Sequence, residues 1–479
     1  MKKMNLLVMS LVSAAALSFT SCSDSEDLAG NSQNKVDKFY MTLTVQTPNS
    51  NGTRTVVNKP TVDATKEESD VTSGTFYLVD ANNKIVFTHT ITKKEWAEEK
   101  IPTQSTNGKT TLQVPVKDVT AGTTYSVYFL ANATSASPLT DVFTSDLANK
   151  FAKKYSEANN FAMFNQNDAD IKGDSHTVVF TSDNKDAKTP AKVSTINIER
   201  LTARIDEPKS AATTIQPYAK DATASDEEKK ANADAIKAVK GVTLTKYAIS
   251  NVANKTNVMQ QWNDATTLSI PTDIAYFQPT TEFGTKTLLQ NYGYFNAVTT
   301  DKSYKDYVFE NNSKDAATSM YFEYTVELND DYKTNADFKD GTFYRYNKVI
   351  YSRIQDIIDA FNDQKAIFNG QTKDAVVAEL EAAKAGPDSE AKLDEFRKKY
   401  DIEVFNAGKT YYVQKIKDQH LGVANTIQRN SIYLLNVKNI FNVGAQVPNG
   451  GPDDRTLYYL EVEVSVNPWV LNSYDVDLQ

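Results

Sequence analysis

The sequence predicts an all-β fold made of two antiparallel β-sandwich domains, and two observations lead to this class. Apolar and polar residues alternate with a period of two in many short segments, which is typical of half-buried strands: 75–79, 85–88, 111–116, 124–130, 177–180 and 193–198. Polar turns separate these segments, and only residues 147–162 among them have a helical pattern. Short strands without intervening helices favour sandwiches over βαβ units.

Length and composition limit what the chain can be. Its 479 residues are enough for two domains, which we expect at residues 36–200 and 201–479. Cys22 is the only cysteine, so no disulfide can form within the chain, and apolar burial must hold the fold together. A net charge of −9 gives no basic field, so nucleic acid is not an expected partner.

The first 35 residues have the pattern of an export signal and a tether. Lys2 and Lys3 precede an apolar run, and Phe19 to Cys22 resembles a bacterial lipobox, so residues 1–21 are predicted to be a signal peptide. Cys22 would then carry lipid, and residues 22–35 would tether the protein to the outer membrane. The alternative is a plain secretory signal with a free cysteine. No second apolar run is long enough for a membrane-spanning helix.

The first domain is predicted to begin with a strand at residues 38–46. Phe39, Met41, Leu43 and Val45 fall on one face of this strand. The polar loop that follows contains Arg54, the only arginine before Arg200, and its composition suits a protease cleft. Arg54 is therefore a candidate site for an arginine-specific protease, although a lone loop arginine can also be a simple solvated side chain.

The second domain is predicted to be a β-sandwich with helical insertions. Strand patterns occur at 242–249, 318–328, 411–416 and 429–440, and a capping box at Ser225 and Glu228 predicts a helix over 229–239. A helical insert is expected at about 352–403, with helices near 354–361, 372–385 and 389–400. Its stripe of isoleucine and phenylalanine is interpreted as packing on the sandwich.

The end of the chain, residues 460–479, is predicted to be an arm of two strands. The two strands are expected to join at residues 467–469, where Pro468 interrupts the ladder of hydrogen bonds. Beyond it Tyr474, Val476 and Leu478 point the same way, as a row of apolar side chains that suits donation to a neighbouring sheet. The alternative is an ordinary last strand that closes its own domain.

No pattern in the chain indicates catalysis, a cofactor or a metal. His89, His176 and His420 lie far apart without metal-ligand spacing. The string Gly173 to His176 is interpreted as a turn before a strand. The acidic residues between Asp330 and Asp340 lack the ligand order of an EF-hand and are interpreted as a solvated loop. We therefore expect a protein that is not an enzyme.

Three ordered segments resemble a known family. Glu199 to Arg204, Arg429-Asn430 with the strand after it, and Val464 to Trp469 before the arm are similar to the Bacteroidota type V pilins, or fimbrillins, and most of all to the short-fimbria major subunit. The resemblance implies two transthyretin-like Greek-key sandwiches, lipoprotein export, and removal of the N-terminal strand by an arginine-specific protease. The helical insert has no counterpart in this pattern.

Carried onto this chain, the resemblance assigns roles to particular residues. Arg54 matches the cleaved arginine; the expelled strand carries Phe39, Met41, Leu43 and Val45, and the donor strand carries Tyr474, Val476 and Leu478. The implied partners are other copies of the chain in a head-to-tail polymer, anchor and tip accessory pilins, and the protease. The implied location is the outer membrane for the lipoprotein precursor, then a fimbria on the cell surface.

The first functional hypothesis is therefore a shaft subunit of a fimbria. The main alternative is a surface glycan-binding lipoprotein, which 25 tyrosines and three tryptophans would suit, because sugars stack on exposed aromatic rings. A third hypothesis, a surface hydrolase, rests only on Asp174, Ser175 and His176.

Overall fold

The computed structural model describes most of the chain after residue 37. The described residues are 38–46, 62–98, 103–106, 109–133, 139–148, 150–166, 176–193, 195–219, 223–264, 266–277, 296–299, 304–418, 421–423, 425–448 and 460–471. Cys22, Arg54, Tyr474, Val476 and Leu478 lie outside these ranges, so their predicted roles stay predictions. The described chain from Lys38 onward belongs to one compact unit, and its predicted division at Leu201 also stays a prediction.

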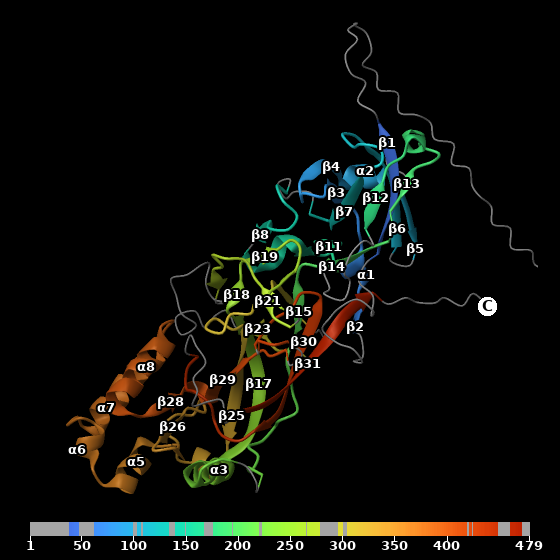
Figure 1. The fold of residues 1–479 in the computed structure, drawn as a ribbon. Coiled ribbons are helices and arrows are strands. Elements are labelled where there is room, and N and C mark those ends of the chain that lie inside the picture. The colour runs from blue at the N-terminus through green and yellow to red at the C-terminus, as the bar shows by residue number, and fades with distance from the viewer. Residues whose placement is uncertain are drawn as a thin grey trace, which may run out of the picture. The chain divides into compact units, whose positions relative to one another are not determined.

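The all-β fold class with helical insertions is confirmed, and the first half is built on one ten-stranded sheet (Figure 1). Its main strand order is β4-β3-β7-β11-β14-β1-β6-β5, while β12 pairs with β7 and β13 with β1. These strands are β1 (Phe39–Gln46), β3 (Gly74–Val79), β4 (Ile85–Ile91), β5 (Thr103–Thr106), β6 (Lys109–Val116), β7 (Thr124–Ala131), β11 (Met163–Asn165), β12 (Thr177–Val179), β13 (Ala191–Lys192) and β14 (Ile196–Arg200).

This sheet encloses an apolar core on one face. Strand β1 contributes four side chains, β6 contributes Leu112, Val114 and Val116, and β3 and β7 face them with Phe76, Leu78, Val127 and Phe129. Strands β1 and β6 thus lie on one side of this core and strands β3 and β7 on the other, as in a sandwich. Strand β1 pairs antiparallel with β6 and parallel with β13 and β14.

The helix predicted over residues 147–162 is wrong. The chain there forms β8 (Asp146–Ala148), a 3-10 helix (Lys150–Tyr155), β9 (Ser156–Glu157) and β10 (Asn160–Phe161). Ala152 and Asn159 have φ angles of 53° and 57°, in the left-handed region that ends regular helix. Tyr155 and Phe161 are buried there without forming a regular helix.

The second half contains two sheets that share a core. One has the order β2-β31-β30-β15-β24, with β16 beside β30, and the other has the order β23-β17-β25-β29. Tyr433, Leu435 and Val437 from the first sheet pack with Phe322, Tyr324 and Tyr412 from the second. The strands are β2 (Val62–Ala64), β15 (Ala203–Asp206), β16 (Lys209–Ser210), β17 (Val239–Ser250), β23 (Asn296–Ala297), β24 (Lys305–Val308), β25 (Ser319–Leu328), β29 (Lys409–Lys415), β30 (Ser431–Ile440) and β31 (Leu460–Leu471).

Short helices and strands lie outside these large sheets. Helix α3 (Asp226–Ala238) begins after the predicted Ser225 cap, whose hydroxyl accepts a hydrogen bond from the Glu228 N–H at 3.2 Å. Strand β18 pairs with β22, β19 with β8, and β20 with β21, each pair as a separate two-stranded sheet. These short elements are α1 (Lys66–Ser69), α2 (Lys93–Ala97), α4 (Asp330–Lys333), β18 (Val252–Ala253), β19 (Lys255–Asn257), β20 (Gln261–Trp262), β21 (Leu268–Ser269) and β22 (Tyr276–Phe277).

The predicted helical insert is present as four helices beside a small sheet. The helices are α5 (Ile354–Phe361), α6 (Gln364–Ile367), α7 (Lys373–Lys384) and α8 (Ser389–Tyr400), and the strands are β26 (Phe343–Tyr346), β27 (Val349–Tyr351) and β28 (Glu403–Phe405). The isoleucines of the α5 stripe pack into a core that these helices make with Tyr344 and Val404, and Phe361 is 41% exposed. The prediction that the stripe packs on the sandwich is therefore wrong, because the insert has a core of its own. None of the described helices combines the length and the apolar character needed to cross a membrane.

The predicted break at Pro468 is wrong, because β31 continues from Leu460 to Leu471. Pro468 pairs with Ser431, the first residue of β30, so it lies at the end of that ladder, where the missing N–H of proline is tolerated. Beyond it, Trp469 to Leu471 pair with β2 instead. At Pro468 strand β31 therefore changes its partner from β30 to β2, where the sequence predicted a junction between two strands.

Candidate assembly site

Strand β1 uses both of its edges in the first sheet. It pairs antiparallel with β6 along its whole length, from Phe39 opposite Val116 to Gln46 opposite Lys109. On its other edge it runs parallel to β13 and then to β14, where Val45 lies opposite Ile196. The predicted lead strand therefore lies inside the sheet, and its removal would expose two rows of backbone groups.

The apolar side chains of β1 are buried in the core. Phe39, Met41, Leu43 and Val45 are exposed by 2%, 0%, 0% and 1%, while the residues between them are half-buried on the other face. The Phe39 ring contacts Phe180 edge-on, with 5.6 Å between ring centroids. Each such side chain contributes about 1.5–3 kcal/mol by burial, so β1 is held mainly by apolar contact.

The other candidate strand, β31, is held by two different neighbours. Leu460 to Pro468 pair antiparallel with β30, and Trp469 to Leu471 pair parallel with Val62 to Ala64 of β2. The short strand β2 thus covers the last residues of β31. The predicted donor residues begin three positions beyond Leu471, outside the described residues.

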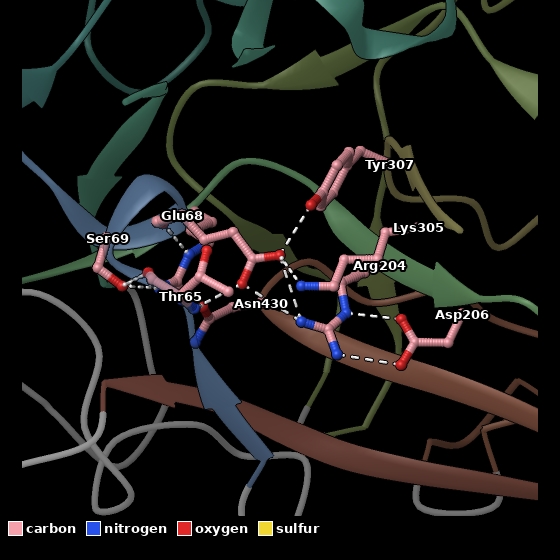
Figure 2. Close-up of polar contacts among 9 residues, drawn as sticks. Thr65, Glu68, Ser69, Arg204, Asp206, Lys305, Tyr307 and Asn430 are labelled. Carbon is pink, nitrogen blue, oxygen red and sulfur yellow. Dashed lines mark hydrogen bonds and ion pairs between the residues drawn. The ribbon is translucent and has the colours of Figure 1, made fainter. Parts of the chain in front are cut away.

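A buried polar cluster lies directly after β2 and centres on Glu68 of α1 (Figure 2). Glu68 is only 2% exposed. Its Oε1 accepts hydrogen bonds from the Tyr307 hydroxyl at 2.7 Å and from the Lys305 Nζ at 3.0 Å, and its Oε2 accepts one from the Thr65 N–H at 2.8 Å. Arg204 Nη1 lies 3.3 Å from both oxygens. Helix α1 is thus attached to β15 and β24 through one carboxylate.

Arg200 binds the same helix through its backbone. This fully buried guanidinium donates to the Glu68 carbonyl oxygen at 2.7 Å, to the Ser69 hydroxyl at 3.0 Å and to the Asn430 Oδ1 at 2.9 Å. Burial lowers the pKa of Arg200 to about 9, so it stays charged at neutral pH. A residue at the end of β14 thereby joins α1 to the start of β30.

The charges around Glu68 decide its protonation. Burial alone raises the pKa of a carboxyl group, but here the hydrogen bonds from Thr65 and Tyr307, the charge of Arg204 and the hydrogen bond from Lys305 lower the pKa of Glu68 to about 2. Arg204 also binds Asp206 through two bonds of 2.7 and 3.0 Å. Glu68 is therefore ionised at neutral pH.

A second buried arginine lies next to this cluster. Arg429 donates to the Val258 carbonyl oxygen at 2.9 Å and lies 2.7 Å from Glu310, whose other oxygen accepts from Gln260 at 2.6 Å. Glu199 lies 3.9 Å from Arg429. The two sequence segments that suggested the family, 199–204 and 429–430, are thus brought together in the fold.

The Glu68 cluster itself was not predicted from the sequence. One local signal was present, because Thr65 and Glu68 have the spacing of a capping box. That signal indicates a helix start but not the partners of the carboxylate, which lie more than a hundred positions further along the chain.

The discarded catalytic and metal candidates have other roles or lie outside the described residues. Gly173, Asp174 and Ser175 belong to the part not described, and the His176 ring contacts Tyr128, with 5.0 Å between centroids. Asp337 accepts the Ile354 N–H at 2.7 Å at the start of α5. Among the described residues, no group of histidine, cysteine and acidic side chains could hold a metal ion.

Fold and site together define an all-β chain whose first strand fills a sheet and whose last strand leads into a terminal arm. Residues 403–475, which include β28 to β31, match the sequence profile of the major fimbrial subunit protein type IV family, fimbrillin, C-terminal region. The match supports the resemblance to the fimbrillins over this C-terminal part of the chain. A comparison with curated proteins found no match.

Thirteen solved chains are similar to this structure. A candidate cell adhesion protein from Parabacteroides distasonis is 12% identical with a TM-score of 0.44, over 90% of this chain and 97% of that one. A fimbrial assembly protein from the same organism is 13% identical with a TM-score of 0.32, over 60% and 82%. A candidate polysaccharide-binding protein from Bacteroides thetaiotaomicron is 11% identical with a TM-score of 0.26, over 92% and 100%. At these values the three structures carry no inference about this chain.

Proposed function

We propose that this chain is a fimbrial subunit, and that it forms the shaft of a cell-surface fimbria by strand exchange. In this proposal the chain is exported as a lipoprotein on Cys22, is cut after Arg54, loses β1, and accepts the arm of another copy in the vacated place. The observation that supports it most is the position of β1, which is paired on both edges and buried along one face, yet is followed by a loop with a single arginine.

The resident strand explains why an uncut chain would stay monomeric. While β1 is covalently attached, it fills its place at a very high effective concentration, and no external strand competes with it. A cut after Arg54 removes this advantage. The trench left by β1 would then expose the edges of β6, β13 and β14 together with apolar side chains, which is costly in water.

The arm has the pattern that such a trench requires. Tyr474, Val476 and Leu478 repeat every second residue, the spacing of the buried β1 side chains. Burying them contributes about 1.5–3 kcal/mol each, and each strand hydrogen bond adds about 1 kcal/mol, against an association cost of about 4–15 kcal/mol. Because donor and acceptor surfaces differ, the contact is head to tail and yields a filament.

The proposed partners follow from these steps. Cys22 lies in the removed segment, so the lipid would hold the precursor at the outer membrane and the cut would release it. An arginine-specific protease makes the cut, and anchor and tip pilins end the polymer. The role is structural rather than enzymatic.

The test uses two variants of the same loop. Purified full chain is treated with an arginine-specific protease, and oligomers are separated on a mildly denaturing gel. We expect ladders from the wild type and from the control Lys59→Ala, and monomers only from Arg54→Ala. Ladders from Arg54→Ala, or from a chain truncated after Leu471, would overturn the proposal.

The glycan-binding alternative finds less support among the described residues. A cavity of about 520 Å³ is lined by polar residues such as Lys153, Asn296 and Lys305, but Tyr307 is the only aromatic residue that lines it. The Tyr307 hydroxyl already donates to Glu68. The cavity therefore lacks the open aromatic platform on which a sugar would stack.

A further inference from the structure

We propose that Glu68 is a positioning residue that fixes strand β2 across the end of β31, so that the segment left after cleavage stays bound at the base of the C-terminal arm. The proposal rests on the proposed function only for the roles of the cut and the arm. The attachment itself is a property of the uncut chain and can be measured there.

The first step of the argument is the position of β2. Val62, Asp63 and Ala64 pair with Trp469, Val470 and Leu471 in parallel register. Leu471 is the last described residue before the predicted donor side chains, so β2 lies against the base of the arm. Arg54 precedes β2 by eight positions, and the cut would leave β2 on the mature chain.

The second step is that β2 needs support. A strand of three residues offers few ladder bonds, and parallel pairs are slightly weaker per residue than antiparallel ones. Thr65 alone separates it from α1, where the Thr65 N–H is bound by the Glu68 carboxylate at 2.8 Å. The clamp on α1 therefore fixes the end of β2 as well.

The third step is the charge balance around Glu68. Arg200, Arg204 and Lys305 contribute three positive charges to the cluster, and Glu68 and Asp206 contribute two negative ones. Neutralising Glu68 would leave these three positive charges with only the negative charge of Asp206, which binds Arg204. A buried charge that loses its partner is strongly unfavourable, so neutralising Glu68 should release α1 from these strands.

The fourth step is the separation from β1. The lead strand lies in the core of the first sheet, whereas α1 contacts residues of β14, β15 and β24. The Arg54 loop lies between the two segments in sequence. None of the hydrogen bonds from α1 described above goes to β1, although Ala64 of β2 and Tyr307 pack against the core to which β1 contributes. Expulsion of β1 would therefore leave these hydrogen bonds in place, so that β2 can remain on β31.

The experiment compares two neighbouring acids in the uncut full chain. Glu68→Gln removes the buried charge, and Glu67→Gln removes an exposed one from the same helix. Hydrogen exchange is followed at residues 62–64 and 469–471, with β17 and β25 as internal references. We expect about tenfold faster exchange at both segments in Glu68→Gln alone, with unchanged references.

A second variant covers the case in which Glu68→Gln folds poorly. Tyr307→Phe removes one hydrogen bond to Glu68 and keeps the ring contact with Phe161, at 4.9 Å between centroids. It should speed exchange at the same two segments by a smaller factor. Unchanged exchange in both variants, or equal acceleration in the reference strands, would overturn the proposal.

Disulfide capture gives an independent measurement. Asp63 and Val470 are register partners, so cysteines at these positions in a Cys22→Ser background should form a disulfide readily. We expect Glu68→Gln to slow its formation about tenfold, while Glu67→Gln leaves the rate unchanged. An equal rate in all backgrounds would contradict the proposal. Neither measurement needs a polymer, so a failure of strand exchange would leave this inference standing.

Discussion

The two segments on either side of the Arg54 loop are held by different forces. Before the loop, β1 is held by four buried apolar side chains and a ladder on each edge. After the loop, Thr65 to Ser69 are held by one buried carboxylate and two arginines from distant strands. The contacts of β1 are mainly apolar contacts and backbone pairs, whereas those of α1 depend on particular charged partners.

This difference fits the proposal that β1 is lost after cleavage while α1 stays bound. Apolar burial is non-directional, so the strand exchange proposed above would need a donor with similar apolar spacing but no unique partner residues. Hydrogen bonds to charged groups need fixed geometry and unique partners, so α1 has no substitute elsewhere in the described chain. Variants of the two segments should therefore respond to different conditions.

The largest effect is expected in β1. Leu43→Ala should lower the free energy of unfolding by about 4 kcal/mol, because Leu43 is fully buried and its loss leaves a cavity. Thr42→Ala, on the half-buried face, should cost about 1 kcal/mol or less. Urea unfolding of both variants measures the difference, and similar costs would show that burial along one face does not hold β1.

The next effect is a pH dependence carried by Glu68. In the folded chain the pKa of Glu68 is lowered to about 2, below the ordinary value of 4.5. Between these two pH values the folded chain therefore binds fewer protons at Glu68 than the unfolded chain does. The stabilisation, about 3 kcal/mol, is complete above pH 4.5 and is lost as the pH falls towards 2. The stability difference between wild type and Glu68→Gln should shrink over this range. A difference that stays constant with pH would exclude the carboxylate as its cause.

A smaller effect is expected at the start of α1. Thr65→Ala removes the hydroxyl of the N-cap residue and should cost about 1 kcal/mol. Thr65→Ser keeps a hydroxyl and should recover most of that loss. Thermal unfolding of the pair measures it, and equal melting temperatures would show that the cap is not needed where Glu68 already binds the helix.

The smallest effect is expected at an exposed ion pair on the same helix. Lys66 contacts Asp70, but the Lys66 side chain is 78% exposed. Lys66→Met should change the free energy of unfolding by no more than about 0.5 kcal/mol, and added salt should reduce the change further. A cost comparable to that of Glu68→Gln would mean that burial does not distinguish the two ion pairs.

The sequence predicted those strands and helices whose positions are set by residues close together in the chain. The alternation in residues 39–45 gave β1, and the capping box at Ser225 gave the start of α3. The helices of the insert were also found, since their apolar stripes face a core. Two predictions failed where contacts between distant segments decide the structure. Pro468 did not end the strand, because it lies at the end of the β30 ladder. Residues 147–162 did not form a helix, because Ala152 and Asn159 have left-handed backbone angles.

The Glu68 cluster could not be predicted because its members meet only through the sheet order. Arg204 and Lys305 lie side by side because β15 pairs with β24, and Asn430 reaches Arg200 because β30 runs parallel to β15. No local spacing encodes these contacts. The segments 199–204 and 429–430 carried the family resemblance. In the structure Arg200 and Arg204 of the first segment hold α1, and Asn430 of the second binds Arg200.

The ladder between β30 and β31 has a mechanical consequence. Nine residue pairs join the two strands, with one bulge after Val437. If the proposed strand exchange takes place, a force applied along β31 from its C-terminal end would stress these pairs in shear and divide the load among them. Such a ladder resists rupture more strongly than a hairpin that is peeled open one bond at a time.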